Sequence, residues 1–172
     1  MSRINMSDGS IYEGEVYDGI PNGFGIKKWE NGEWLEGEWD RGMFRNGKGV
    51  RISNYEDSNG IMRNIRYEGE FKDGYQDGFG TETDYTDGSM YSGGWKKGSH
   101  YGKGHEIYAP LGLTLEGNWE GIAGAEGYGT ITYADGRRYE GPWKGVFPDG
   151  IGTMIYPDGT KRTGKWSFGN PA

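Results

Sequence analysis

The sequence predicts an all-β protein made of successive antiparallel hairpins, and three observations predict it. A motif of the form Tyr-Glu-Gly-x-aromatic recurs along the chain, bulky and polar residues alternate within each copy, and Asp-Gly or Asn-Gly pairs separate many of the copies. Alternation with a period of two places side chains on opposite faces of a strand. Recurrence at a constant period is typical of repeat proteins whose units stack on their neighbours.

The composition suits a thin core with many tight turns. The 172 residues, about the length of one domain, include 35 glycines, and 33% are hydrophobic while 15% are aromatic. Low hydrophobicity together with a net charge of -7 favours disorder, but disordered segments are poor in aromatic residues. We therefore expect residues 1–172 to form a single ordered domain.

Each repeat contains a glycine flanked by bulky residues, as in "YEGEF", "LEGEW" and "YEGPW". Successive central glycines are 23, 32, 24, 24, 24 and 23 residues apart, and a Gly-x-Gly sequence follows each of the first six after nine or ten residues. The central glycines are Gly14, Gly37, Gly69, Gly93, Gly117, Gly141 and Gly164.

Each unit contains two predicted strands. The first, as in residues 67–71, puts Tyr67, Gly69 and Phe71 on one face and glutamates on the other. The second, as in "GTITY" at 129–133, alternates in the same way. The pairs at 31–32, 87–88, 135–136 and 158–159 supply the positive φ that tight hairpin turns need.

The two ends and one unit depart from this pattern. "RINMSDG" near the beginning and "KRTGKWSFG" near the end each supply half a unit, which gives six full hairpins and thirteen or fourteen strands. Residues 50–66 add extra length around Asn59-Gly60. We expect them to form a lengthened hairpin that extends beyond the sheet edge.

Stacking of the hairpins is required, because a lone hairpin is barely stable in water. It places the Tyr and Trp positions of successive units in rows on one face. The glycine between two bulky residues then has a physical role, because only a missing side chain lets a neighbouring ring lie flat on the backbone.

The pattern resembles the MORN (membrane occupation and recognition nexus) repeat, most closely in "YEGEFKDGYQDGFG" and "RYEGPWKGVFPDGIGTMIYPDG". The resemblance covers nearly the whole chain. It implies an elongated, twisted, single-layer antiparallel sheet, the MORN-repeat solenoid. It also implies scaffold or binding roles without catalysis, in which the repeats organise complexes, hold a partner segment in an aromatic groove, or lie near membranes.

No group of residues predicts catalysis, a cofactor or a metal. Without cysteine there is no thiol nucleophile, disulfide or thiolate zinc site. His100 and His105 are the two histidines, and we expect them at an exposed turn and strand position. Nucleotide-binding, nucleophile-elbow and calcium-repeat motifs are missing.

The aromatic face has two interpretations. Most rings form the core, but a single-layer sheet has no second layer to cover them, so the central units are predicted to offer a groove to a peptide or helix of a partner protein. Trp34 and Met90 fall on the polar face, as a second contact patch or a shield for the sheet. The predicted partner-binding residues are Tyr67, Phe71, Tyr91, Trp95, Trp119, Tyr139 and Trp143.

Two alternatives to a protein-interaction scaffold remain open. Net acidity disfavours nucleic acid as a partner. From Arg137 onward, however, the sequence contains six basic residues and only three acidic ones. An anionic membrane or phosphoinositide surface is therefore the second prediction, and a carbohydrate on exposed aromatics is the third. The predicted lipid-binding residues are Arg137, Arg138, Lys161 and Arg162.

Location and self-association follow from simple sequence features. The sequence shows no signal peptide and no apolar run of membrane-spanning length, so we expect a cytoplasmic protein, membrane-peripheral in the lipid alternative. The first strand near Ile4 and the last near Trp166 are sheet edges, which predicts weak homo-oligomerisation.

Overall fold

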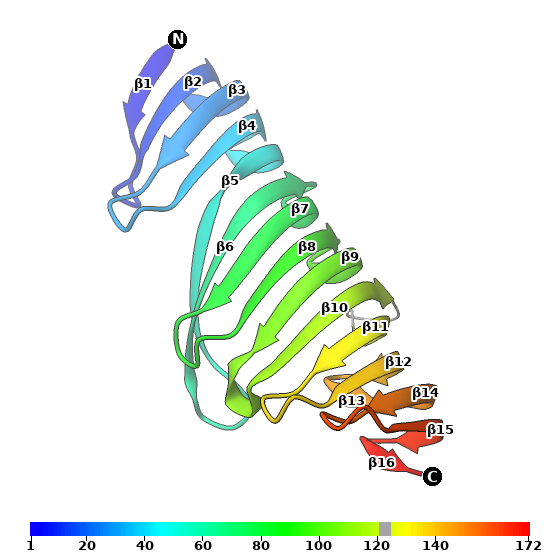
Figure 1. Ribbon diagram of the computed structural model, residues 1–172. Coiled ribbons are helices and arrows are strands. Elements are labelled where there is room, and N and C mark those ends of the chain that lie inside the picture. Colours follow the sequence, from blue (N-terminus) through cyan, green and yellow to red (C-terminus); the bar gives the residue numbers. More distant parts are fainter. Residues whose placement is uncertain (121–124) are drawn as a thin grey trace.

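The computed structural model describes residues 1–120 and 125–172 and shows one antiparallel sheet of sixteen strands. Figure 1 shows the strands following one another in chain order, with the two termini at opposite ends. This confirms the predicted all-β class. The first eight strands are β1 (Ser2–Asn5), β2 (Ile11–Tyr17), β3 (Ile20–Lys28), β4 (Trp34–Asp40), β5 (Met43–Glu56), β6 (Met62–Lys72), β7 (Tyr75–Asp84) and β8 (Met90–Lys96).

The second half of the chain continues the same sheet. A short 3₁₀ helix, η1 (Ala109–Leu111), precedes β10. Each strand pairs with its neighbours in sequence, except that β13 pairs only with β12. The remaining strands are β9 (Ser99–Tyr108), β10 (Leu113–Glu120), β11 (Glu126–Thr132), β12 (Arg138–Lys144), β13 (Phe147–Pro148), β14 (Gly150–Ile155), β15 (Lys161–Ser167) and β16 (Asn170–Pro171).

The strand count exceeds the expected thirteen or fourteen because of two short strands. β13 and β14 together occupy the place of one expected strand, which is interrupted at Asp149, where the backbone N–H donates to the Pro142 carbonyl. β16 forms because the chain turns back after Phe168 and pairs two residues with β15. Both additions depend on local backbone geometry that the repeat pattern does not encode.

Two kinds of turn connect most of the described strands. The predicted Asp-Gly and Asn-Gly pairs have positive φ at their glycines, and the aspartate or asparagine oxygen accepts the N–H two residues on, as in Asp158 to Thr160 at 2.9 Å. At the other edge, a non-glycine residue with φ between 46° and 51° precedes a glycine that also has positive φ. Two consecutive positive φ values define type I′ hairpin turns. The sequence analysis did not identify these five turns, at Asp18-Gly19, Arg41-Gly42, Asp73-Gly74, Lys97-Gly98 and Phe168-Gly169.

A row of paired glycines crosses the sheet from β2 to β15. A Cβ atom on Gly104 would lie 2.5 Å from Tyr91 Oη and 2.7 Å from its Cζ, because the ring lies directly on the glycine backbone. The predicted role of the central glycines is thereby confirmed where a tyrosine ring lies on the glycine pair, as at Gly69, Gly93 and Gly141, whereas a Cβ atom on Gly164 would meet no atom of the described residues within 4 Å. This glycine row consists of Gly14, Gly25, Gly37, Gly47, Gly49, Gly69, Gly80, Gly93, Gly104, Gly117, Gly129, Gly141, Gly152 and Gly164.

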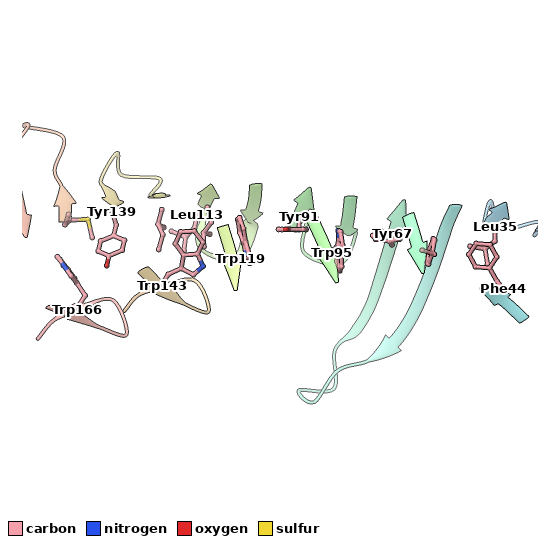
Figure 2. Close-up of a cluster of buried hydrophobic side chains, with 14 of the residues drawn as sticks. Leu35, Phe44, Tyr67, Tyr91, Trp95, Leu113, Trp119, Tyr139, Trp143 and Trp166 are labelled. Carbon is pink, nitrogen blue, oxygen red and sulfur yellow. The ribbon is translucent and has the colours of Figure 1, made fainter. Parts of the chain in front are cut away.

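The core is a row of rings on one face of the sheet, which we call the aromatic face. Figure 2 shows labelled rings such as Tyr67, Tyr91 and Trp119 following one another across the strands. Neighbouring rings meet mostly edge to face, for example Tyr67 and Trp95 with centroids 5.1 Å apart. Because the rings cover one another and the glycine backbone, a single layer buries a core without a second layer.

Several of the core rings bond their polar atoms to the backbone in a repeated way, although the Tyr139 hydroxyl and the Trp143 indole N–H have no hydrogen-bond partner among the described residues. The indole N–H of Trp95 donates to the carbonyl of Gly80, 3.1 Å away, and Trp39 and Trp166 make the equivalent bond. The Tyr67 hydroxyl donates to the carbonyl of Glu70 at 2.9 Å, at a β-bulge between Gly69 and Phe71. A bulge takes one residue out of the strand pairing, which leaves its carbonyl free to accept the hydroxyl.

The β5–β6 hairpin is the one long departure from the repeat. Its strands pair as far as Glu56 and Met62, and Figure 1 shows the hairpin reaching past the neighbouring turns. Arg63 forms an ion pair with Asp57 of the hairpin's own turn at 3.0 Å, and it holds the hairpin to the end of β7 and the β7–β8 turn through Asp84 and Asp87 at 2.9 and 2.6 Å. The lengthened hairpin is therefore bound by side chains to the next turn at the same edge of the sheet.

Candidate functional site

The seven predicted partner-binding rings lie in the core. Their exposed fractions range from 0 to 5%, so almost none of their surface is available to a partner. This burial supports the interpretation of the rings as the core, and their direct contact with a partner stays a prediction. The residues concerned are Tyr67, Phe71, Tyr91, Trp95, Trp119, Tyr139 and Trp143.

The four predicted lipid-binding residues do not gather in one patch. Arg138 and Lys161 both pair in register with Ile155, on the face opposite the core, whereas Arg162 pairs with Met154 on the aromatic face. Arg138 also forms an ion pair with Glu140, and Arg137 forms one with Asp135. Lipid binding by these residues stays a prediction.

The expected exposure of His100 is wrong. Its ring stacks on Tyr91 with centroids 3.6 Å apart, and burial lowers its pKa to about 4. The reason is the bulge between Gly93 and Trp95, which places His100 opposite Trp95 on the aromatic face. His105 lies on the opposite face, paired in register with Ser92.

The face opposite the core, which we call the outer face, carries exposed apolar side chains that the sequence analysis did not single out. They are central residues of the Gly-x-Gly sequences and are 60 to 75% exposed: Phe24, Phe79, Tyr128 and Ile151. Lys48 and Lys103 hold the same place in the alternate units. The sequence did contain a signal for these residues. The central residue of each Gly-x-Gly is the direct neighbour of a glycine in the glycine row, so its side chain points to the opposite face of the sheet. We call these six residues the outer row.

Two features recur beside the outer rings Phe24 and Phe79 and position them. The first glycine of the triplet has positive φ, 97° at Gly23 and 108° at Gly78. The bulge glutamate then reaches across, so that Glu70 Oε2 accepts the N–H of Phe79 at 2.6 Å and Glu15 Oε2 accepts that of Phe24 at 3.3 Å. The second glutamate of the "YEGE" motif therefore positions Phe24 and Phe79.

Shallow hollows lie on the outer face beside Phe24 and Phe79. One of about 570 Å³ is bordered by Phe24, Gly37 and Lys48, and one of about 460 Å³ by Phe79 and Lys103. Trp34 and Met90 also lie on this face, as expected, and both are half-buried. The outer face thus combines exposed rings with room beside them.

A separate cavity of about 320 Å³ lies on the aromatic face, between the β5–β6 hairpin and strands β7 to β9. Burial and the charge of Glu82 raise the pKa of Glu106 to about 7, and burial and the charge of Asp84 raise that of Glu82. We call this the hairpin groove; its lining includes Tyr55, Arg63, Glu82, Tyr91, His100, Glu106 and Tyr108.

In residues 1–120 and 125–172, no three His, Asp or Glu side chains are grouped so that they could hold a metal ion. Within the same ranges, no helix is long and apolar enough to span a membrane.

Comparison with known families agrees with the geometry. The family model described as "MORN repeat" matches residues 12–34, 67–90, 123–137 and 139–161. None of the curated proteins compared with the chain matches it. MORN repeats are a non-enzymatic module that generally mediates interactions with proteins or membranes. With four matches spread over one sheet of successive hairpins, the chain is a MORN-repeat protein.

Proposed function

We propose that this protein is a non-enzymatic scaffold that binds a segment of a partner protein along the outer row. The observation that carries the proposal is the exposure of Phe24, Phe79, Tyr128 and Ile151 at equivalent places of the repeat. Aromatic side chains held on a rigid backbone are typical anchors of protein interfaces, because they bury much area at little cost in conformational entropy.

The spacing of the outer row limits the shape of the partner. Phe24, Phe79 and Tyr128 lie on β3, β7 and β11, so successive rings are four strands, or roughly 19 Å, apart. An extended segment covers that distance with about six residues and a helix with about thirteen. The hollows beside Phe24 and Phe79 leave room for partner side chains next to these two rings.

Site-specific photo-crosslinking in cells tests the proposal. A benzophenone amino acid at position 79 or 24 should give a discrete crosslinked protein. The matched controls are Tyr75 and Tyr85, which are similarly exposed but lie outside the outer row. The double change Phe24→Ser and Phe79→Ser should remove the crosslink from position 128 without lowering the melting temperature. Equal crosslinking from the control positions, or none from the outer row, would contradict the proposal.

Membrane association, carbohydrate binding and a cytoplasmic location stay predictions. The separation of the basic residues onto two faces gives the lipid alternative no single binding surface.

We also propose weak self-association through the sheet edges. Among the described strands, β16 covers only Trp166 and Ser167 of β15, and β1 pairs on one side only. Unpaired strand edges are templates for pairing. Light scattering that stays monomeric at high concentration would exclude this.

A further inference from the structure

The hairpin groove is independent of the outer row, because it lies on the opposite face. Its floor is formed by β7, β8 and β9, where Tyr91 pairs in register with Glu82 on one side and with Glu106 on the other. Strands two apart are roughly 10 Å from each other, so the two carboxylates flank the groove. Tyr55 of the hairpin borders it from above and is half exposed.

The two glutamates have no cation of their own. Within the described part of the chain, neither Glu82 nor Glu106 forms an ion pair, although Asp57, Asp84 and Asp87 in the same cavity all share Arg63. The groove therefore contains five carboxylates and one guanidinium, and that guanidinium already forms ion pairs with three of the carboxylates.

The other nearby cation points away from the groove. Arg51 pairs in register with Tyr67, but its guanidinium donates to the Gly74 carbonyl at 3.2 Å and lies 5.0 Å from the Phe71 ring centroid. Burial raises the pKa of Glu106 to about 7, and a cation placed beside this carboxyl would favour its charged form. Charge complementarity thus indicates that the missing group is a cation.

We propose that the hairpin groove binds a basic side chain, arginine or lysine, of a partner protein, with its cation between Glu82 and Glu106. The volume of about 320 Å³ is at the low end for ligand pockets and suits one side chain. The rings of Tyr55 and Tyr108 offer apolar surface to the aliphatic stem and an attractive face to the cation. The scaffold then holds two partner segments, one on each face.

The experiment is a titration of the protein with the capped tripeptide Gly-Arg-Gly, followed by NMR signals of the His100, Tyr91 and Tyr108 rings. The same peptide with citrulline in place of arginine is the neutral control of nearly equal shape. The arginine peptide should shift the groove signals at a lower concentration than the citrulline peptide. The changes Glu82→Gln and Glu106→Gln together should weaken arginine binding by at least about tenfold.

A matched variant separates the groove from the general acidity of the protein. Glu36→Gln with Glu38→Gln removes the same charge from the outer face and should leave arginine binding unchanged. Equal binding of the two peptides, an equal loss in the outer-face variant, or no saturable shift with arginine would overturn the proposal. A response to Ca²⁺ or Mg²⁺ that displaces the peptide would overturn it as well, because the site would then be a metal site. A failure of the crosslinking experiment on the outer row affects none of these outcomes.

Discussion

Replacing Gly104 by alanine adds one methyl group at a point where the structure has no room for it. The new Cβ atom would lie 2.5 Å from Tyr91 Oη and 2.7 Å from Cε2 and Cζ, whereas carbon atoms normally approach to about 3.5 Å. The ring cannot easily move, because His100 stacks on it at 3.6 Å and Trp95 and Trp119 meet it at 5.4 and 5.1 Å. The added methyl group therefore creates strain.

The expected cost follows from two effects. Overpacking of this kind costs about 1–3 kcal/mol, and the displaced Tyr91 hydroxyl loses its hydrogen bond to the Gly94 carbonyl, worth about 1 kcal/mol. The lower chain entropy of alanine in the unfolded state returns about 0.4–1 kcal/mol. We expect Gly104→Ala to lower the free energy of unfolding by about 2–3 kcal/mol, measured by urea denaturation with tryptophan fluorescence.

Gly164 is the matched control, because it belongs to the same glycine row but a Cβ atom there meets nothing within 4 Å. Gly164→Ala should be neutral or stabilise slightly. In a Tyr91→Leu background the cost of Gly104→Ala should shrink, which a double-mutant cycle measures directly. If the two glycine substitutions cost the same, the role assigned to the glycine row is wrong.

Three further predictions concern the rings and the hairpin. Trp95→Ala should lower the free energy of unfolding by about 3–5 kcal/mol, because a buried indole and its hydrogen bond to Gly80 are lost; a change under about 1 kcal/mol would contradict a core role. Glu106 should make stability fall as pH rises from about 4.5 to about 7, because its folded pKa is raised above its ordinary value and ionisation is then penalised, by at most about 3 kcal/mol. Denaturation of Glu106→Gln at several pH values should show a flatter curve, and an unchanged curve would refute this. Arg63→Met should speed hydrogen exchange of the amides in residues 52–62, and unchanged exchange would show that the ion pairs do not hold the hairpin.

The repeat pattern predicted the fold because each of its parts has a local physical cause. The alternation at 67–71 determines which side chains share a face, and a glycine such as Gly69 explains how rings can lie on a single sheet. The pattern could not show that neighbouring rings bury one another to within a few per cent, and partner binding on the aromatic face stays a prediction.

The features missed from the sequence depend on backbone geometry or on distant contacts. The bulge between Gly93 and Trp95 shifts the register by two residues, so that Trp95 pairs with His100 instead of Gly102, and the His100 ring stacks on Tyr91. The hairpin groove exists because Arg63 joins the hairpin to a turn more than twenty residues away. Neither the bulge nor the ion pairs change the periodicity of the sequence, so the repeat pattern could not predict them. The outer row could have been predicted from the sequence, because the alternation of faces along a strand puts the central residue of each Gly-x-Gly opposite to the aromatic face.

The account rests on the claim that one face of the sheet is a closed core and the other presents exposed rings. Hydroxyl-radical footprinting of the folded protein, read by mass spectrometry, measures this directly for each side chain. Phe79 and Tyr128 should be oxidised nearly as fast as in the unfolded chain, and Tyr67, Tyr91 and Trp119 only at a small fraction of that rate. Rapid oxidation of the second group, at the rate of the first, would show an open aromatic groove and contradict the account.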